Sequence, residues 1–136
     1  MNEIIKAVKN LLSEKRIITL AIDGMSAAGK STLANELSKR FDSNVFHMDD
    51  FFLTGELRTP QRLKQVGGNV DYVRFKDEVL EKIKLNEPFS YRAYSCVSGE
   101  FSKREVMPKK FNIVEGAYSL HPTLLKFYDY KIMIKT

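Results

Sequence analysis

Several features that would mark a special structural class are missing from this sequence. Cysteine occurs once, at Cys96, so no internal disulfide can form, which agrees with a reducing compartment. No apolar run approaches the roughly 20 residues that a helix needs to cross a bilayer. The first 16 residues mix charges with apolar side chains, unlike a signal peptide. We therefore expect a cytoplasmic protein that is not associated with a membrane.

The charge distribution also lacks a nucleic-acid signature. The net charge is +5, but Lys and Arg are scattered among acids, with no arginine-rich run and no basic helix face. A mild cationic excess suits an enzyme of phosphorylated ligands equally well, and we expect no nucleic-acid partner. Repeats, linkers and low-complexity tracts are absent too. A chain of 136 residues with 43% hydrophobic content predicts one domain over residues 1–136.

What the sequence does contain is a phosphate-binding loop pattern. Residues 24–31 read Gly-Met-Ser-Ala-Ala-Gly-Lys-Ser, which fits Gly, four residues, Gly, Lys, and Ser or Thr. Residues 17–22 before it are apolar, as expected of a strand buried on both faces. Residues 31–40 after it have the spacing of a helix. Because strand, loop and helix occur together, the segment predicts a site for nucleotide phosphates.

Each part of this loop has an expected task. Gly24 and Gly29 let backbone N–H groups turn toward phosphate oxygens, next to the partial positive charge of a helix N-terminus. Lys30 would reach the β- and γ-phosphates, and the Ser31 hydroxyl would take a coordination position on Mg²⁺. ATP and Mg²⁺ are therefore the predicted cofactors. The predicted nucleotide contacts are Gly24, Met25, Ser26, Ala27, Ala28, Gly29, Lys30, Ser31 and Thr32.

The remaining chain alternates helical and strand patterns. The expected elements are a helix over 3–14, a strand over 44–48, a loop over 53–69 with a short helix near 61–65, a helix over 71–85, a hairpin within 89–107, a strand over 111–114, a short helix over 122–127 and a strand over 130–134. This order predicts an α/β three-layer fold with a mostly parallel sheet. Its ligand should lie beyond the carboxyl ends of the strands.

Acidic residues follow two of these strands at that edge. Asp49 and Asp50 come after the strand over 44–48, and Glu115 follows the strand over 111–114. Phosphoryl transfer needs one carboxylate to orient or deprotonate the accepting hydroxyl and another on the metal side. We assign the first role to Asp49 and the second to Glu115, beside Ser31, with Asp50 as the competitor for either. Local backbone capping by the aspartates and a purely structural Glu115 are the alternatives.

Five short segments follow one another in a recognisable order. They are residues 24–31, 47–52 (His-Met-Asp-Asp-Phe-Phe), 68–72 (Gly-Asn-Val-Asp-Tyr), 91–94 (Tyr-Arg-Ala-Tyr) and 113–116 (Ile-Val-Glu-Gly). This succession, within residues 17–136, resembles the uridine kinase and phosphoribulokinase-like branch of P-loop kinases, and so implies a P-loop NTPase fold.

The resemblance implies roles for individual residues. Asp49 matches the acid that activates the substrate hydroxyl, and Glu115 matches the acid on the metal side. Asp71 lies where the family holds ribose hydroxyls, and Tyr94 falls in the hairpin that covers the nucleobase. Arg92 is a further candidate substrate contact, as is Asp50. The alternatives are a helix cap for Asp71, hairpin packing for Tyr94 and a solvent-exposed Arg92.

This sequence departs from the family in two places. Uridine kinases follow the hairpin tyrosine with an aromatic residue and a base-reading histidine, where this chain has Cys96 and Gly99. His47 and His121 lie elsewhere, and a loop or core position is expected for each. The family also continues beyond the last strand into an arginine-bearing lid and a further strand, which are missing here.

These observations predict an ATP-dependent, uridine-kinase-like enzyme that transfers the γ-phosphoryl group to a primary hydroxyl of a nucleoside or similar small molecule. The alternative, raised by the missing lid, is a truncated, non-catalytic nucleotide- or phosphate-binding module. A nucleotide-switch hydrolase is disfavoured, because residues 113–116 lack an Asp-x-x-Gly switch and no Asn-Lys-x-Asp guanine reader occurs. The sequence leaves the oligomeric state open, a homo-oligomer included.

Overall fold

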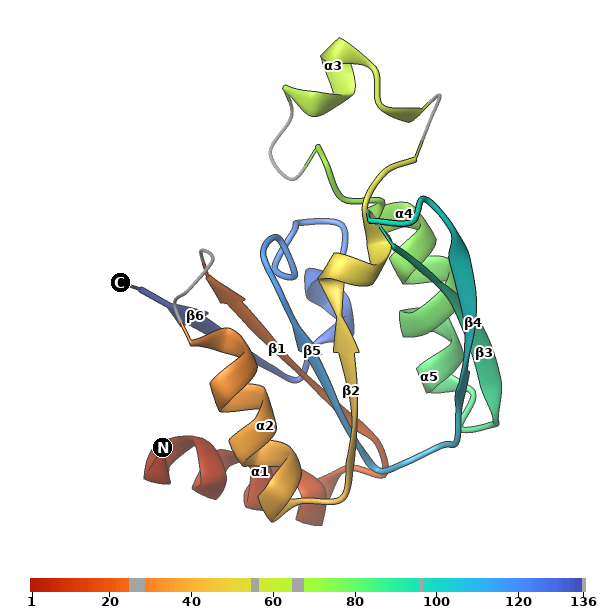
Figure 1. Cartoon of the computed structure of the whole chain (residues 1–136). Coiled ribbons are helices and arrows are strands. Elements are labelled where there is room, and N and C mark those ends of the chain that lie inside the picture. Colours follow the sequence, from red (N-terminus) through yellow and green to blue (C-terminus); the bar gives the residue numbers. More distant parts are fainter. Residues whose placement is uncertain (25–28, 55–56, 65–67, 96, 136) are drawn as a thin grey trace.

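The computed structural model describes residues 1–24, 29–54, 57–64, 68–95 and 97–135. Its central sheet has four parallel strands in the order β2-β5-β1-β6 (Figure 1). The strands are β1 (Ile18–Gly24), β2 (Ser43–His47), β5 (Phe111–Glu115) and β6 (Tyr130–Ile134). All four strands predicted for the sheet are confirmed. Because β5 lies between β1 and β2, the residues that follow these three strands meet at one edge.

Different layers cover the two faces of this sheet. On one face lie α1 (Asn2–Glu14) and α2 (Lys30–Arg40), and on the other a helix over 72–84 and a hairpin (Figure 1). Side chains alternate between the faces with the period of two of a strand. In β1, Leu20 and Ile22 pack with Val8 of α1 and Leu37 of α2, whereas Ala21 belongs to the opposite apolar cluster. The predicted three-layer α/β arrangement is thus confirmed.

The helix over 72–84 is continuous but not uniform. It consists of α4 (Tyr72–Phe75), a π-helical turn η3 (Lys76–Leu80) and α5 (Glu81–Lys84). Asp71 caps its start, because the Asp71 Oδ1 accepts a hydrogen bond of 3.1 Å from the Arg74 N–H. Phe75 and Val79 are fully buried against the sheet cluster. The predicted helix over 71–85 is confirmed, with Asp71 as its cap.

The hairpin stands apart from the main sheet. It pairs β3 (Phe89–Tyr94) with β4 (Phe101–Val106) in antiparallel register. The Tyr91 ring stacks on the Phe51 ring at 5.5 Å between centroids and contacts the Phe46 ring at 5.8 Å. These aromatic contacts hold the hairpin beside the segment that follows β2. Each ring pair contributes about 0.5–1.5 kcal/mol of stability in addition to the effect of its buried area.

The short helical segments differ from expectation in detail. Met48 begins a 3-10 turn, η1 (Met48–Phe51), so the strand predicted over 44–48 ends at His47. The helix predicted over 122–127 is only a 3-10 turn, η4 (Leu125–Phe127), because the Phe127 N–H bonds to the Leu124 carbonyl three residues back. None of the described helices combines the length and apolar character needed to traverse a membrane.

The short helix predicted near 61–65 is confirmed as α3 (Pro60–Leu63), although Gln65 lies outside the described residues. Thr59 caps it by accepting a 3.1 Å hydrogen bond from the Arg62 N–H. Figure 1 shows α3 at the top of the molecule, set away from the sheet.

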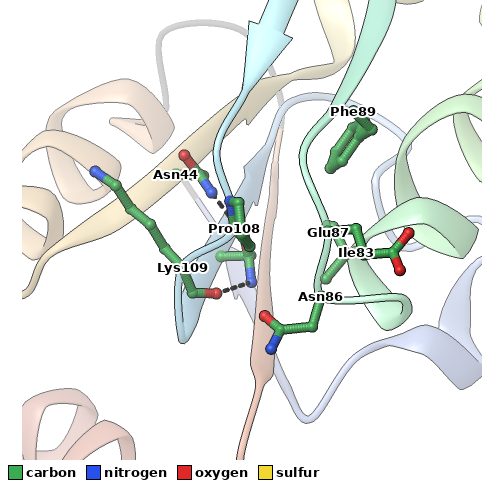
Figure 2. A pocket seen from close by; sticks show the side chains of 8 residues that line it. Asn44, Ile83, Asn86, Glu87, Phe89, Pro108 and Lys109 are labelled. Carbon is green, nitrogen blue, oxygen red and sulfur yellow. Dashed lines mark hydrogen bonds between the residues drawn. The ribbon is translucent and has the colours of Figure 1, made fainter.

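A small hollow at the amino end of the sheet is lined by eight residues, among them Asn44, Asn86 and Asn112 (Figure 2). The Asn44 Nδ2 donates to the Met107 carbonyl at 2.9 Å and to the Asn112 Oδ1 at 3.2 Å, and the Asn112 Nδ2 donates to the Lys109 carbonyl at 3.2 Å. The remaining volume is about 10 Å³, room for one water molecule. This network joins β2 to β5 and leaves no ligand site there.

Candidate active site

The predicted phosphate-binding pattern, residues 24–31, begins at the carboxyl end of β1. The strand ends at Gly24, and α2 begins at Lys30 directly after Gly29, whose φ of 93° is in the left-handed region that favours glycine. Ser31 and Thr32 continue the first turn of α2. No side chain of the described residues caps this N-terminus, so its backbone N–H groups are available to phosphate oxygens. The predicted contacts at 25–28 lie outside the described residues.

A buried carboxylate anchors the start of this loop. Asp23 is 7% exposed and accepts hydrogen bonds from the backbone N–H groups of Gly24 (2.6 Å), Tyr118 (3.1 Å) and Leu120 (2.9 Å). These bonds tie the end of β1 to the loop after β5. Sequence reasoning missed Asp23, although an isolated acid between an apolar strand and a glycine loop is a usable signal.

A glycine allows the end of β5 to touch η1. Gly116 has a φ of 140°, and a Cβ added there would lie 2.6 Å from the Met48 Cβ. No larger residue fits without moving η1. The backbone therefore holds Glu115, the residue before this glycine, close to the turn that carries Asp49.

Glu115 is paired with the last residue of β2. The parallel register sets His47 beside Glu115, and the His47 Nδ1 lies 2.5 Å from the Glu115 Oε1. This hydrogen bond raises the pKa of His47 more than partial burial lowers it, and the charges of Glu115, Asp50 and Asp49 add to the rise. His47 thus orients one oxygen of the 5% exposed Glu115 at the ligand edge.

The donor chemistry at this edge suits Mg²⁺. That ion prefers oxygen ligands and, in nucleotide sites, is held by one or two protein groups together with substrate phosphates. The Ser31 hydroxyl after β1 and the Glu115 carboxylate at the end of β5 are such groups. Among the described residues, no three His, Cys, Asp or Glu side chains gather into a metal cluster, at this edge or elsewhere. A magnesium ion here would therefore depend on the phosphates of a bound nucleotide.

A pocket of about 340 Å³ lies between η1 and the hairpin. Its lining residues are Asp49, Asp50, Phe52, Ala93, Tyr94, Ser95, Ser102 and Arg104. Three of the predicted site residues, Asp49, Asp50 and Tyr94, are therefore brought together. Arg104 was missed by sequence reasoning, because nothing local distinguishes it from the other cations of the hairpin.

The two aspartates of this pocket have different environments. Asp49 is exposed, whereas Asp50 is half-buried. Burial raises the pKa of Asp50, although the charges of Arg104 and His47 oppose this rise. Among the described residues, the buried Asp50 Oδ2 has no hydrogen-bond partner. Neither aspartate caps η1 through its side chain, so the capping alternative is not realised in this turn.

Arg74 connects the two walls of the pocket, which are η1 and the hairpin. Its Nη1 donates to the Arg92 carbonyl of β3 at 2.6 Å, and its Nη2 donates to the Asp50 carbonyl of η1 at 3.2 Å. The guanidinium carbon also lies 4.3 Å from the centre of the Phe51 ring. With its side chain only 10% exposed, Arg74 fixes the distance between η1 and the hairpin. Sequence reasoning missed this residue, because its partners come from three separate segments.

Asp71 and Arg92 belong to this supporting network and do not line the pocket. Asp71 realises its alternative role as a helix cap. The Arg92 side chain is 57% exposed and its Nη2 lies 2.9 Å from the Glu78 Oε2. Tyr94 lines the pocket and also packs against Phe101, with 5.1 Å between ring centroids. Direct substrate contacts by Asp71 and Arg92 stay predictions.

Substitution of Glu78 by glutamine is expected to weaken the attachment of the hairpin and to lower the free energy of unfolding at neutral pH by about 1 kcal/mol. Burial alone would raise the pKa of Glu78, but hydrogen bonds from Arg92 and the charges of Arg74 and Arg92 lower it overall. The stabilisation by ionised Glu78 is thus fully present above pH 4.5, the pKa of this residue in the unfolded chain. It is lost as the pH falls through the lower pKa that Glu78 has in the folded protein. Urea unfolding of wild type and Glu78→Gln at several pH values measures this difference.

The stability gap between these two proteins should shrink as the pH falls below the unfolded pKa of Glu78, and a gap independent of pH would contradict the ion-pair explanation. Glu105→Gln is the control. Its side chain is 82% exposed on β4, so its stability should stay within about 0.5 kcal/mol of wild type.

Comparisons with known proteins support the fold. No protein-family model matches the sequence, and no curated protein gives a significant match. Among solved structures, the chain is similar to a possible uridine kinase from Bacillus stearothermophilus, with a TM-score of 0.74 and 22% sequence identity. The match covers 96% of this chain and 80% of that chain. The chain thus has an α/β fold with a mostly parallel central sheet, similar to the fold of this neighbour.

Proposed function

We propose that this chain is an ATP-dependent small-molecule kinase that transfers the γ-phosphoryl group to a primary hydroxyl. The main support is the position of Asp49. It lines a pocket and follows β2 at the same sheet edge as Lys30 and Ser31. Transfer to a hydroxyl needs an acceptor pocket next to a phosphate site, with a carboxylate between them. The similarity to a possible uridine kinase agrees with this proposal at the level of the fold.

In the proposed reaction, the first backbone N–H groups of α2 and the Lys30 ammonium hold the phosphates of ATP. The acceptor lies in the pocket with its hydroxyl beside Asp49. The hydroxyl oxygen bonds to the γ-phosphorus, the bond to the β,γ-bridging oxygen breaks, and ADP leaves with that electron pair. The hydroxyl proton passes to Asp49. Mg²⁺, held by Ser31 and Glu115, would neutralise phosphate charge.

The remaining predicted substrate residues divide into two groups in this proposal. Asp50 and Tyr94 line the pocket and contact the acceptor directly. Asp71 and Arg92 act behind them. They position the pocket wall through the contacts of Arg74 with η1 and β3.

The test is to incubate the purified chain with ATP, Mg²⁺ and single acceptors, and to follow ADP. The acceptors are nucleosides, pantothenate, glycerate and sugar phosphates. We expect ADP that depends on an acceptor, because the proposed reaction needs a hydroxyl to receive the phosphoryl group. Equal ADP without any acceptor would instead indicate a hydrolase. Nucleotide binding without ADP from any acceptor would indicate a non-catalytic binding module.

A further inference from the structure

We propose that Arg104 determines acceptor specificity, and that the acceptor carries an anionic group, a carboxylate or a phosphate, in addition to its hydroxyl. This inference rests on the proposed function and identifies the class of its substrate. It is carried by the position of Arg104 in the pocket, by the partners of the neighbouring arginines and by the chemistry of the facing wall.

The hairpin register places Arg104 on the inner face. In the antiparallel ladder Tyr91 pairs with Arg104, and Ala93 pairs with Ser102. Residues paired across an antiparallel ladder share one face of the hairpin. Tyr91 is 6% exposed and Ala93 is 3% exposed, so their face is the one packed toward the protein. Arg104 therefore belongs to the face that looks onto η1, in agreement with its place in the pocket lining.

Arg104 differs from the other two arginines of this region in its partners. Arg74 is bonded to backbone carbonyls of η1 and β3, and Arg92 is paired with Glu78. Within the described chain, the Arg104 side chain makes no hydrogen bond or ion pair, and it acts on Asp50 only through its charge. A guanidinium presents donors in a planar fork that matches a carboxylate or a phosphate. An anionic group of a ligand in the pocket would therefore be the partner of the Arg104 guanidinium.

The facing wall has the complementary chemistry. Asp49 is exposed to the pocket, and the Asp50 Oδ2 is buried without a hydrogen-bond partner in the described residues. Carboxylates accept hydrogen bonds, so this wall suits hydroxyl groups. An acceptor with hydroxyls at one end and an anionic group at the other would bind the aspartates of one wall and Arg104 of the other. A neutral nucleoside leaves Arg104 without an anion.

The decisive comparison is Arg104→Gln against Lys103→Gln. Lys103 is the preceding residue of β4, its side chain is 69% exposed, and it does not line the pocket. Both substitutions remove one positive charge, but only Arg104→Gln removes guanidinium donors from the pocket. We expect Arg104→Gln to raise the KM of an anionic acceptor about 10- to 100-fold with little change in kcat, as for loss of a charged hydrogen bond. Lys103→Gln should leave both constants unchanged.

The acceptor panel separates the two sources of negative charge. Glycerate and pantothenate carry a carboxylate, and sugar phosphates carry a phosphate. Uridine is the neutral comparison. Arg104→Lys keeps the charge but loses the fork, so it should recover only part of the affinity. A neutral nucleoside as the best acceptor, or equal effects of Arg104→Gln and Lys103→Gln, would overturn the inference and leave the proposed kinase intact.

A second measurement keeps the inference and the proposed function separable. Acceptor binding is followed without ATP, as the rise in melting temperature that each acceptor causes. Anion binding that depends on Arg104 but yields no ADP would support the acceptor assignment and reject the kinase. Failure of every anionic acceptor to bind would reject the acceptor assignment.

Discussion

Substitution of Lys30 by alanine is expected to remove nucleotide binding and, with it, the formation of ADP. Lys30 is the first residue of α2, directly after Gly29. In the proposed reaction, its ammonium contacts the phosphates, where negative charge develops during transfer. Loss of one preorganised donor of this kind costs about 10²–10³ in rate. The measurements are the ATP-induced rise in melting temperature and the rate of ADP release.

Lys39→Ala is the matched control. Lys39 lies in the last turn of the same helix, with a side chain 74% exposed and a 3.8 Å contact to Glu36. The Lys39→Ala substitution removes one lysine from α2 at the end far from the predicted phosphate loop, so nucleotide binding should persist. Unchanged ATP binding by Lys30→Ala would show that the loop assignment is wrong.

Substitution of Asp49 by asparagine is expected to lower kcat about 10²- to 10⁴-fold, the usual contribution of a general base. Asparagine keeps the size of the side chain and can still accept a hydrogen bond, but it cannot take the hydroxyl proton. ATP binding should be unaffected, because Asp49 follows β2 and is not part of the phosphate loop. The measurement is kcat with the best acceptor, together with the affinity for ATP.

Asp50→Asn decides between the two aspartates. Asp50 is half-buried, and burial raises its pKa, which suits a hydrogen-bonding contact to the acceptor. We expect this variant to raise the KM of the acceptor more than it lowers kcat. If Asp50→Asn loses kcat and Asp49→Asn does not, Asp50 is the base and Asp49 is the acceptor contact.

The strand and the helix that flank the predicted phosphate loop could be expected from the sequence, because their determinants are local. The pattern over 24–31, the apolar residues before it and the helical spacing after it lie within about 25 consecutive residues of sequence. The structure begins and ends these elements close to the expected positions, with β1 at Ile18–Gly24 and α2 at Lys30–Arg40. The same holds for Asp49 and Asp50, which lie in the short turn η1 after β2.

The partners of these residues were not predictable, because they depend on strand order. His47 meets Glu115 only because β5 inserts between β1 and β2. Arg74 joins η1 to the hairpin through contacts 24 and 18 residues away in the sequence. Neither contact follows from the spacing of residues along the chain, and both shape the candidate site.

The sequence by itself determined the strand and the helix around the predicted phosphate loop, the alternating elements and the acids at the strand ends, since each depends on neighbouring residues. Only the tertiary structure decided which hairpin cation lines the pocket. β4 reads Phe-Ser-Lys-Arg-Glu-Val, with charged side chains on both faces, so its period of two does not reveal the inner face. The burial of Tyr91 and Ala93 on β3 decides it, and places Arg104 rather than Arg92 beside the two aspartates.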